Sequence, residues 1–214
     1  ENPSISQDGS KVVWEYGRGH GSQIHIYDFN TRIGQELYGM PGGDQEYPSV
    51  DNEWVVWEDN RNGNWDIYMK DLATGGVEQR VSTSPGDNRV ADISGDIVVW
   101  QSVIGGVADI RLKNIVTGVE QAVTSDAAYQ NSPRISGDLI VWEDYRNGNW
   151  DIYKKDLTSG VESPLASGPS TQARPAIDRE KVVYEGTAGG SYDIWMDIVP
   201  DTTPPVISKQ SPAD

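Results

Sequence analysis

The sequence predicts an all-β fold, a five-bladed β-propeller with four antiparallel strands per blade, and three observations lead to this prediction. The chain holds five copies of one unit, each unit contains several short strand-like runs, and no stretch has convincing helical periodicity. Four strands in a unit of ~40–45 residues are typical of a propeller blade. A β-sandwich or an open solenoid is the alternative, but neither explains why the same strands return at nearly constant spacing.

The repeat is clearest in a Val-Val-Trp-Glu-like run, which we expect to form the second strand of each blade. Its aromatic residue returns after 43, 43, 42 and 42 residues, at Trp14, Trp57, Trp100, Trp142 and Tyr184. The run is apolar on both faces, as expected of a strand that is covered on both sides. These aromatics should therefore lie between blades, and Trp142 is a predicted core residue.

The other strands keep the same register. The third strand begins at Gln23, Asp66, Asp109, Asp151 and Asp193. The first strand is expected to open at Pro3, Pro48, Ala91, Pro133 and Pro175, because proline cannot donate to a ladder and suits the first position of a strand. The fourth, a polar edge strand, is expected at residues 35–38, 77–82, 119–124 and 161–166.

These strands define one domain of residues 1–199, with blades at about 1–42, 43–85, 86–128, 129–170 and 171–199. We expect the five blades to close into one ring, with blade one packed on blade five; Val13 or Trp14 in solvent would indicate an open array instead. Blade five lacks an obvious fourth strand. Residues 200–214 are either a linker or a closing strand, and residues 206–209 are the favoured candidate for that strand.

Composition excludes several classes of function. The chain has 17 Lys+Arg against 33 Asp+Glu, a formal net charge of -16. Such a chain repels phosphate backbones and anionic lipid, so we expect no nucleic-acid partner and no direct membrane insertion. The absence of cysteine excludes disulfides, thiolate zinc sites and thiol nucleophiles. We expect an acidic monomer without a cofactor.

Two stretches resemble a known family. Residues 60–75 contain Arg-Asn-Gly-Asn-Trp-Asp-Ile-Tyr, and residues 145–157 repeat it. They resemble the TolB-like propeller repeats of archaeal and bacterial cell-surface proteins, and the likeness extends from residue 1 to about 199, although the Arg-Asn-Gly-Asn-Trp stretch is intact only in blades two and four. The resemblance implies an extracellular or envelope scaffold that binds proteins or glycans, generally without a catalytic residue set. Residues 201–214 also resemble the start of a bacterial immunoglobulin-like surface domain, and a disordered proline-rich tail is the alternative.

The loop between the second and third strands of blade two could hold calcium. Asn60, Asn62, Asn64 and Asp66 place side-chain oxygens at alternate positions, as calcium loops do. The same slots in blades one, three and five hold Gly19-His20, Gly105-Gly106 and Gly189-Gly190, which share only an ability to adopt positive φ. A structural turn is the favoured interpretation, and calcium binding is the alternative.

The acidic residues that recur at equivalent positions in four of the five blades are interpreted as structural. Equivalent acids in equivalent blades do not supply the differentiated pair that glycoside hydrolysis needs. The acid position of the second strand holds glutamate in four blades, at Glu15, Glu58, Glu143 and Glu185, but Gln101 in blade three. This exchange indicates a hydrogen-bonding role. With only His20 and His25 in the chain, Ser-His-Asp chemistry lacks its partners. The remaining candidates for a polysaccharide-active hydrolase or lyase are Asp44, Glu46, Asp87 and Asp92.

Recognition is expected on one face of the propeller. In a four-stranded blade, the loop that enters the first strand and the loop between the second and third strands emerge at the same edge. These loops bring amides, arginines and tyrosines to the channel mouth, and such side chains recognise glycans and peptides. The candidate binding residues are Gln45, Tyr47, Asn88, Arg89, Gln130, Gln172, Arg174, Arg61, Arg146 and Tyr145. The alternative is that the amides brace their own loops.

Taken together, the sequence predicts a non-catalytic binding, adhesion or scaffolding module of a larger cell-surface protein. Its partner would be a protein or a glycan on the channel-mouth face. A carbohydrate-binding, lectin-like propeller is the first alternative, and a polysaccharide-active enzyme is the second.

Overall fold

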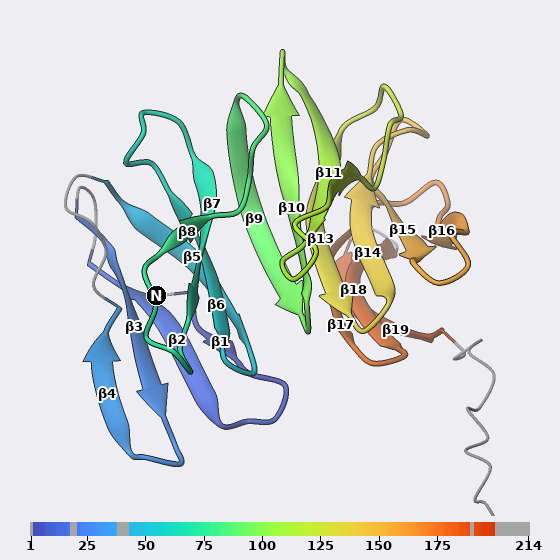
Figure 1. The fold of residues 1–214 in the computed structure, drawn as a ribbon. Helices are drawn as coiled ribbons and strands as arrows, with labels where there is room; N and C mark the ends of the chain where they lie inside the picture. The colour runs from blue at the N-terminus through green and yellow to red at the C-terminus, as the bar shows by residue number, and fades with distance from the viewer. Residues whose placement is uncertain (1, 18–20, 38–42, 189–190, 200–214) are drawn as a thin grey trace, which may run out of the picture.

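The computed structural model describes residues 2–17, 21–37, 43–188 and 191–199 (Figure 1). Within these residues the chain forms four four-stranded sheets and one three-stranded sheet, all antiparallel, and no helix. The strands of each sheet are consecutive in the chain, so every sheet is a simple meander. The predicted all-β class and the five repeated units are therefore confirmed.

The first sheet contains β1 (Ser4–Ile5), β2 (Lys11–Tyr16), β3 (Gln23–Asp28) and β4 (Ile33–Glu36), and the second contains β5 (Gln45–Asp51), β6 (Trp54–Asp59), β7 (Asp66–Asp71) and β8 (Gln79–Arg80). The third contains β9 (Asp87–Ser94), β10 (Ile97–Ile104), β11 (Val107–Asn114) and β12 (Glu120–Ala122), and the fourth contains β13 (Gln130–Ser136), β14 (Leu139–Asp144), β15 (Asp151–Asp156) and β16 (Glu162–Ala166). The fifth contains β17 (Gln172–Asp178), β18 (Lys181–Ala188) and β19 (Ser191–Ile198). We call these sheets blades one to five.

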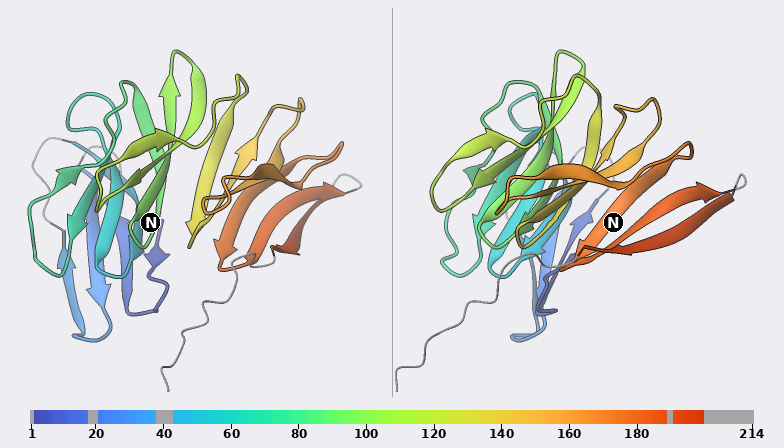
Figure 2. Two further views of the ribbon diagram at one scale, coloured as in Figure 1. Left: turned by 45° about the vertical axis from the view of Figure 1, so that its right-hand side comes forward. Right: turned by 90° about the vertical axis from the view of Figure 1, so that its right-hand side faces the viewer.

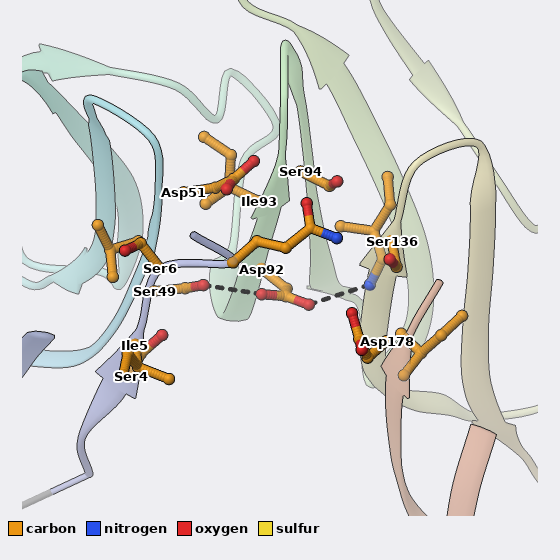
Figure 3. A pocket seen from close by; sticks show the side chains of 14 residues that line it. Ser4, Ile5, Ser6, Ser49, Asp51, Asp92, Ile93, Ser94, Ser136 and Asp178 are labelled. Atoms are coloured by element: carbon orange, nitrogen blue, oxygen red, sulfur yellow. Dashed lines mark hydrogen bonds between the residues drawn. The ribbon is translucent and has the colours of Figure 1, made fainter. Parts of the chain in front are cut away.

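The blades stand around a central channel. The innermost strands β1, β5, β9, β13 and β17 together line a cavity of about 360 Å³ (Figure 3). One carboxylate joins three of these strands: Asp92 on β9 accepts hydrogen bonds from Ser49 Oγ on β5 (2.7 Å) and from the Ile135 amide on β13 (3.0 Å). The wall of the channel is therefore polar, and the hydrogen bonds of Asp92 connect three blades along it.

The hydrophobic core lies between blades. Each interface packs the aliphatic face of one blade against the aromatic face of the next. For example, Val56 and Ile67 of blade two share a buried cluster with Val98 and Trp100 of blade three. Trp57, Trp100 and Trp142 are among the largest fully buried side chains, as the repeat predicted.

The predicted start of the first strand is wrong. The first strands of blades two, four and five begin three residues before the proline, which lies inside the strand at a shift in register. The residue before the proline has positive φ at Tyr47 (49°), Ser132 (49°) and Arg174 (52°). At such a bulge the ladder is interrupted, so a residue without an amide hydrogen is tolerated within a strand.

The predicted closure of the ring is not observed either. Buried clusters join blades one and two, two and three, three and four, and four and five, but none joins the described residues of blade five to those of blade one. Val13 is buried, but its cluster is the one shared with blade two. Figures 1 and 2 show the blades following one another from the first (blue) to the fifth (orange-red), which lie at the two ends of an open arc.

Two further expectations concern the closing strand and membrane insertion. Residues 206–209, the candidate closing strand, lie outside the described residues. Across the described ranges, no helix is long and apolar enough to cross a membrane.

Candidate functional site: the loop face

The edge predicted to carry the binding loops is formed as expected. In blade two, Gln45 pairs with Asp59, and Asp59 pairs with Asp66. The start of the first strand, the end of the second and the start of the third therefore lie side by side, and blade four repeats this register. We call the surface formed by these strand ends and by the loops 60–65 and 145–150 the loop face.

Three of the four predicted amides are buried within this edge. Gln45 donates to Asp59 (3.3 Å), and Gln130 donates to the Ala128 carbonyl (2.8 Å). Asn88 accepts from the Trp100 indole (3.0 Å) and donates to loop carbonyls. These side chains brace their own loops and present little surface to a ligand. Gln172 differs, because its buried Oε1 has no hydrogen-bond partner among the described residues.

Two of the predicted arginines are anchors of the hairpin loops. Arg61 forms a bidentate pair with Asp59 and also contacts Glu78 (2.8 Å). Its guanidinium lies 4.3 Å from the ring centroid of Tyr68, and Arg146 lies 4.1 Å from that of Tyr153 in the equivalent place. Such charge-assisted and cation–π contacts hold the arginines against their own blades.

The other two arginines differ in exposure. Arg89 is held by Glu58 (2.7 Å) and Glu46 (3.2 Å), and its guanidinium lies 4.2 Å from the Trp65 ring centroid. The Arg174 side chain is 76% exposed and pairs with Glu185 at 2.9 Å. Because an exposed pair is weak and readily rearranged, Arg174 is the predicted arginine that a ligand can reach most easily.

A cluster of partly exposed aromatic side chains lies on the loop face of blade four. Trp150 makes edge-to-face contacts with Tyr145 (5.1 Å between ring centroids) and with Tyr129 (6.2 Å). Tyr129 and Tyr145 are 40% and 44% exposed, and a backbone hydrogen bond from the Tyr145 amide to the Tyr129 carbonyl holds their loops together at 3.0 Å. We call these three residues the aromatic ledge.

A cavity of about 510 Å³ opens beside the ledge, and it is lined by Trp150, Thr171, Ala173, Arg174, Glu185, Tyr192, Asp193 and Ile194. Of the ledge and cavity residues, the sequence predicted only Tyr145 and Arg174 as binding residues. Trp150 could have been found in the Arg-Asn-Gly-Asn-Trp stretch, which was interpreted as a turn. Tyr129 precedes the Gln130 slot, where the other blades have Asp44, Asp87 and Thr171, so this tyrosine is an exception to the repeat.

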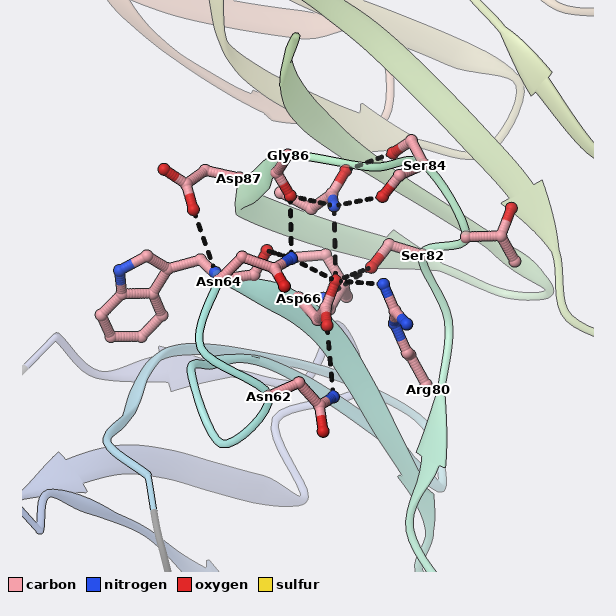
Figure 4. Close-up of polar contacts among 12 residues, drawn as sticks. Asn62, Asn64, Asp66, Arg80, Ser82, Ser84, Gly86 and Asp87 are labelled. Atoms are coloured by element: carbon pink, nitrogen blue, oxygen red, sulfur yellow. Dashed lines mark hydrogen bonds and ion pairs between the residues drawn. The ribbon is translucent and has the colours of Figure 1, made fainter.

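The proposed calcium residues do not converge on one point. Asp66 is buried and accepts hydrogen bonds from Asn62 (3.3 Å), Asn64 (3.2 Å) and Arg80 (2.6 Å), as Figure 4 shows. Asn60 is bonded to Asp44 instead. In the described part of the chain, no group of three or more His, Asp or Glu side chains is placed to hold a metal ion. The positive charge beside Asp66 is that of Arg80.

In blades two, three and four, the acid or amide near the end of the second strand reaches across to the next blade. Glu58 accepts the Val90 amide at 2.6 Å, and Glu143 accepts the Arg174 amide at 2.6 Å. Gln101 donates to the Gln130 carbonyl at 3.2 Å instead. Burial raises the pKa of Glu58, although Arg89 and the Val90 amide oppose the shift. The predicted hydrogen-bonding role is therefore confirmed in these blades.

The four candidate catalytic acids are each bonded to a different protein partner. Asp44 accepts the Gly21 amide (2.6 Å), Asp87 accepts the Trp65 amide (3.1 Å), and Glu46 binds Arg89. Asp92 lies in the channel wall between Ser49 and Ile135. Burial raises the pKa of Asp92, and Arg134 and these hydrogen bonds oppose it.

Comparison with known proteins gives matches in structure but not in sequence. No family model matches the chain, and no curated protein matches it. TolB from Acinetobacter baumannii superposes with a TM-score of 0.71 at 20% identity, over 92% of this chain and 51% of that one. The fold is TolB-like. A putative TolB from Agrobacterium tumefaciens matches at a TM-score of 0.70 and 16% identity, over 92% of this chain and 75% of that one.

The TolB-like fold is shared with an enzyme as well. An oligogalacturonate lyase in complex with manganese matches at a TM-score of 0.62 and 14% identity, over 93% of this chain and 65% of that one. This chain spans about half the length of the Acinetobacter TolB that it matches. At these sequence identities the matches establish the fold alone, and the function depends on the residues of the loop face.

Proposed function

We propose that this chain is a non-catalytic recognition module of an extracellular or cell-surface protein and that it binds a glycan or a protein segment on the aromatic ledge. The observation that carries the proposal is the exposure of Tyr129 and Tyr145 beside Trp150, next to a cavity of about 510 Å³. Exposed aromatics that are fixed by contacts with one another provide a large contact area at low entropic cost.

The polar groups around the ledge can orient a ligand through directional hydrogen bonds. Arg174 lines the cavity together with Glu185, so the site offers a donor and an acceptor next to a stacking surface. A sugar ring can stack its C–H face on an aromatic ring while its hydroxyls bond to such groups, and a proline- or aromatic-containing peptide can use the same features. A lectin-like role is therefore one form of the proposal, and protein binding is the other.

The absence of catalysis belongs to the same proposal. Asp44 and Asp87 accept backbone amides, and Glu46 is paired with Arg89, although burial and the neighbouring Glu15 raise the pKa of Glu46. One observation favours the rival, a polysaccharide-active enzyme. Asp92 has a raised pKa and lines the channel of a fold that resembles a lyase.

The binding proposal is tested with a glycan array and a peptide library, followed by titration of any hit. Trp150→Ala and Tyr145→Ala should each weaken binding by about tenfold or more, as expected for an aromatic hot spot. Phe29→Ala is the matched control, since Phe29 is also a half-exposed aromatic but follows β3, at the opposite edge of blade one. A ligand whose affinity is unchanged by both ledge variants would show that recognition occurs elsewhere.

The enzyme alternative has a separate test. Incubation with neutral and acidic polysaccharides should release no new reducing ends and no unsaturated products. Turnover that is lost in Asp87→Asn or Asp92→Asn would replace the recognition proposal by an enzymatic one.

A further inference from the structure

The two ends of the arc are complementary halves of the interface that joins the blades. At the far side of blade five, Ile194 is 72% exposed and Met196 is 59% exposed. The residues that occupy the Ile194 position in the other blades are at most 1% exposed, because the next blade covers them: Ile24, Ile67, Ile110 and Ile152. Val183 and Met196 are directly paired, so this face is continuous across β18 and β19. We call it end face five.

The opposite end of the arc presents the other half. Trp14 occupies the position of Trp57, Trp100 and Trp142, which are fully buried against the preceding blade, yet Trp14 is only partly covered. Ile5 and Tyr16, on the same face of blade one, are 62% and 65% exposed. We call this surface end face one. Blade one thus has an aromatic face, as in every other interface, but no blade covers it.

The hydrogen-bonding part of the interface is also present at both ends. Between blades two and three, Glu58 accepts the amide of Val90, whose φ is 54°, and Glu143 accepts the Arg174 amide in the same way. Glu185 is the last acid of this series, and it binds Arg174 of its own blade. Asn2, with φ of 52°, is the first residue of the positive-φ series. End face five therefore carries the acceptor, Glu185. End face one carries Asn2, which corresponds in position to the amide donors Val90 and Arg174 of the other interfaces.

We propose that one further four-stranded blade of the same repeat type occupies the gap between blades five and one and completes the propeller. Such a blade would present a buried aromatic, at the position of Trp142, to Ile194 and Met196. Its aliphatic face would cover Trp14. Its first strand would offer an amide to Glu185, and its second-strand acid would accept from Asn2.

A single blade fits this gap better than a second copy of the chain. All four existing interfaces share one arrangement, and the inner strands of all five blades line one channel. A second copy that packed its blade one on end face five would cover that face alone. A single blade carries both an aromatic and an aliphatic face, so it can cover both ends of one chain.

The experiment adds the missing blade from the chain itself. Residues 129–172 are fused directly before Glu1, so that Gln172 of the added copy stands three residues before Pro3, as it does before Pro175. In the fusion, the amides of Tyr184 and Trp195, which are paired between β18 and β19, should gain at least about tenfold protection from hydrogen exchange, and a single cooperative transition should replace that of the shorter chain at a higher temperature. An added copy that carries Trp142→Lys and Ile152→Lys cannot pack on either end face and serves as the matched control.

A point variant distinguishes three structures that could cover end face five: an added blade, a second copy of the chain, and blade one of the same chain. Ile194→Lys should leave the melting temperature of the unfused chain within about one degree of the parent, because the side chain is exposed, but should lower that of the fusion clearly. Val77→Lys, at an exposed aliphatic residue of blade two outside both end faces, should affect neither protein. A chain that is dimeric without the fusion and monomeric as Ile194→Lys would identify a second copy as the occupant. An unfused chain that Ile194→Lys destabilises would indicate closure by blade one, and either result overturns the proposal, as does an added blade that unfolds independently.

Discussion

Arg146 holds Asp144 through two parallel hydrogen bonds, from Nε to Oδ1 at 2.9 Å and from a terminal guanidinium nitrogen to Oδ2 at 2.6 Å. The carboxylate is fully buried, and the Trp142 indole donates to it as well at 3.0 Å. A loop arginine that the sequence placed on a recognition surface therefore neutralises a buried charge beside the core. Its equivalent in blade two, Arg61, holds Asp59 in the same way.

Arg146→Ala should destabilise the protein by about 3 kcal/mol, because it leaves Asp144 buried without its charged partner. Arg174→Ala is the control: that arginine is exposed, its pair with Glu185 is accessible to water, and its loss should leave the stability nearly unchanged. Chemical denaturation of both variants measures the difference. Equal effects would show that the buried pair contributes no more than a surface pair.

Trp142→Ala should cost ~3–5 kcal/mol, as other large-to-small core substitutions do. The same substitution at the same repeat position in blade one, Trp14→Ala, should cost clearly less, because no blade covers that face. Urea unfolding of the two variants makes the comparison within one chain. A similar loss at both positions would mean that Trp14 is as well packed as Trp142, and it would contradict the open arc.

The repeat made the blades predictable, because a strand that is covered on both faces has to be apolar on both faces and because it recurs at constant spacing. The bulge at Pro48 was not predictable in this way, since proline suits both a strand start and a bulge and only the pairing register distinguishes them. Ring closure depends on the angle between successive blades, which results from the packing of many side chains. On the loop face, the arginines were identified by type, but their burial depends on neighbours such as Tyr68 that lie on another strand.

Asp92 should make stability depend on pH. Burial raises its folded pKa above the unfolded value of 3.8. A raised pKa means that the contribution of this group is fully present below pH 3.8 and is lost as the pH rises through the folded value. The stability of Asp92→Asn relative to the parent protein should therefore increase with pH above 3.8, after a constant offset for the altered bonds to Ser49 and Ile135. Denaturation at a series of pH values gives this difference, and a difference that is constant or falls with pH would contradict the assignment.

Calcium should not stabilise blade two. Arg80 contacts Asp66 at 2.6 Å, and the neighbouring amides of Asn62 and Asn64 already donate to that carboxylate. Addition of calcium or of a chelator should therefore leave the melting temperature unchanged. Arg80→Ala provides the sharper test, since it removes the competing cation. A stabilisation by calcium in the parent protein would show that the asparagines rotate to act as ligands and would restore the calcium interpretation.

Removal of residues 200–214 tests how blade five ends. The third strands β7, β11 and β15 each pair with an outer strand, whereas β19 pairs only with β18 among the described residues. An unpaired strand edge attracts another strand, and residues 206–209 are the nearest β-prone segment in the sequence. We therefore expect the truncated chain to melt at a lower temperature or to dimerise through β19, as measured by calorimetry and light scattering. A truncated chain that stays monomeric with an unchanged melting temperature would establish these residues as a linker, because an outer strand cannot be removed without exposing the hydrogen-bonding edge that it covers.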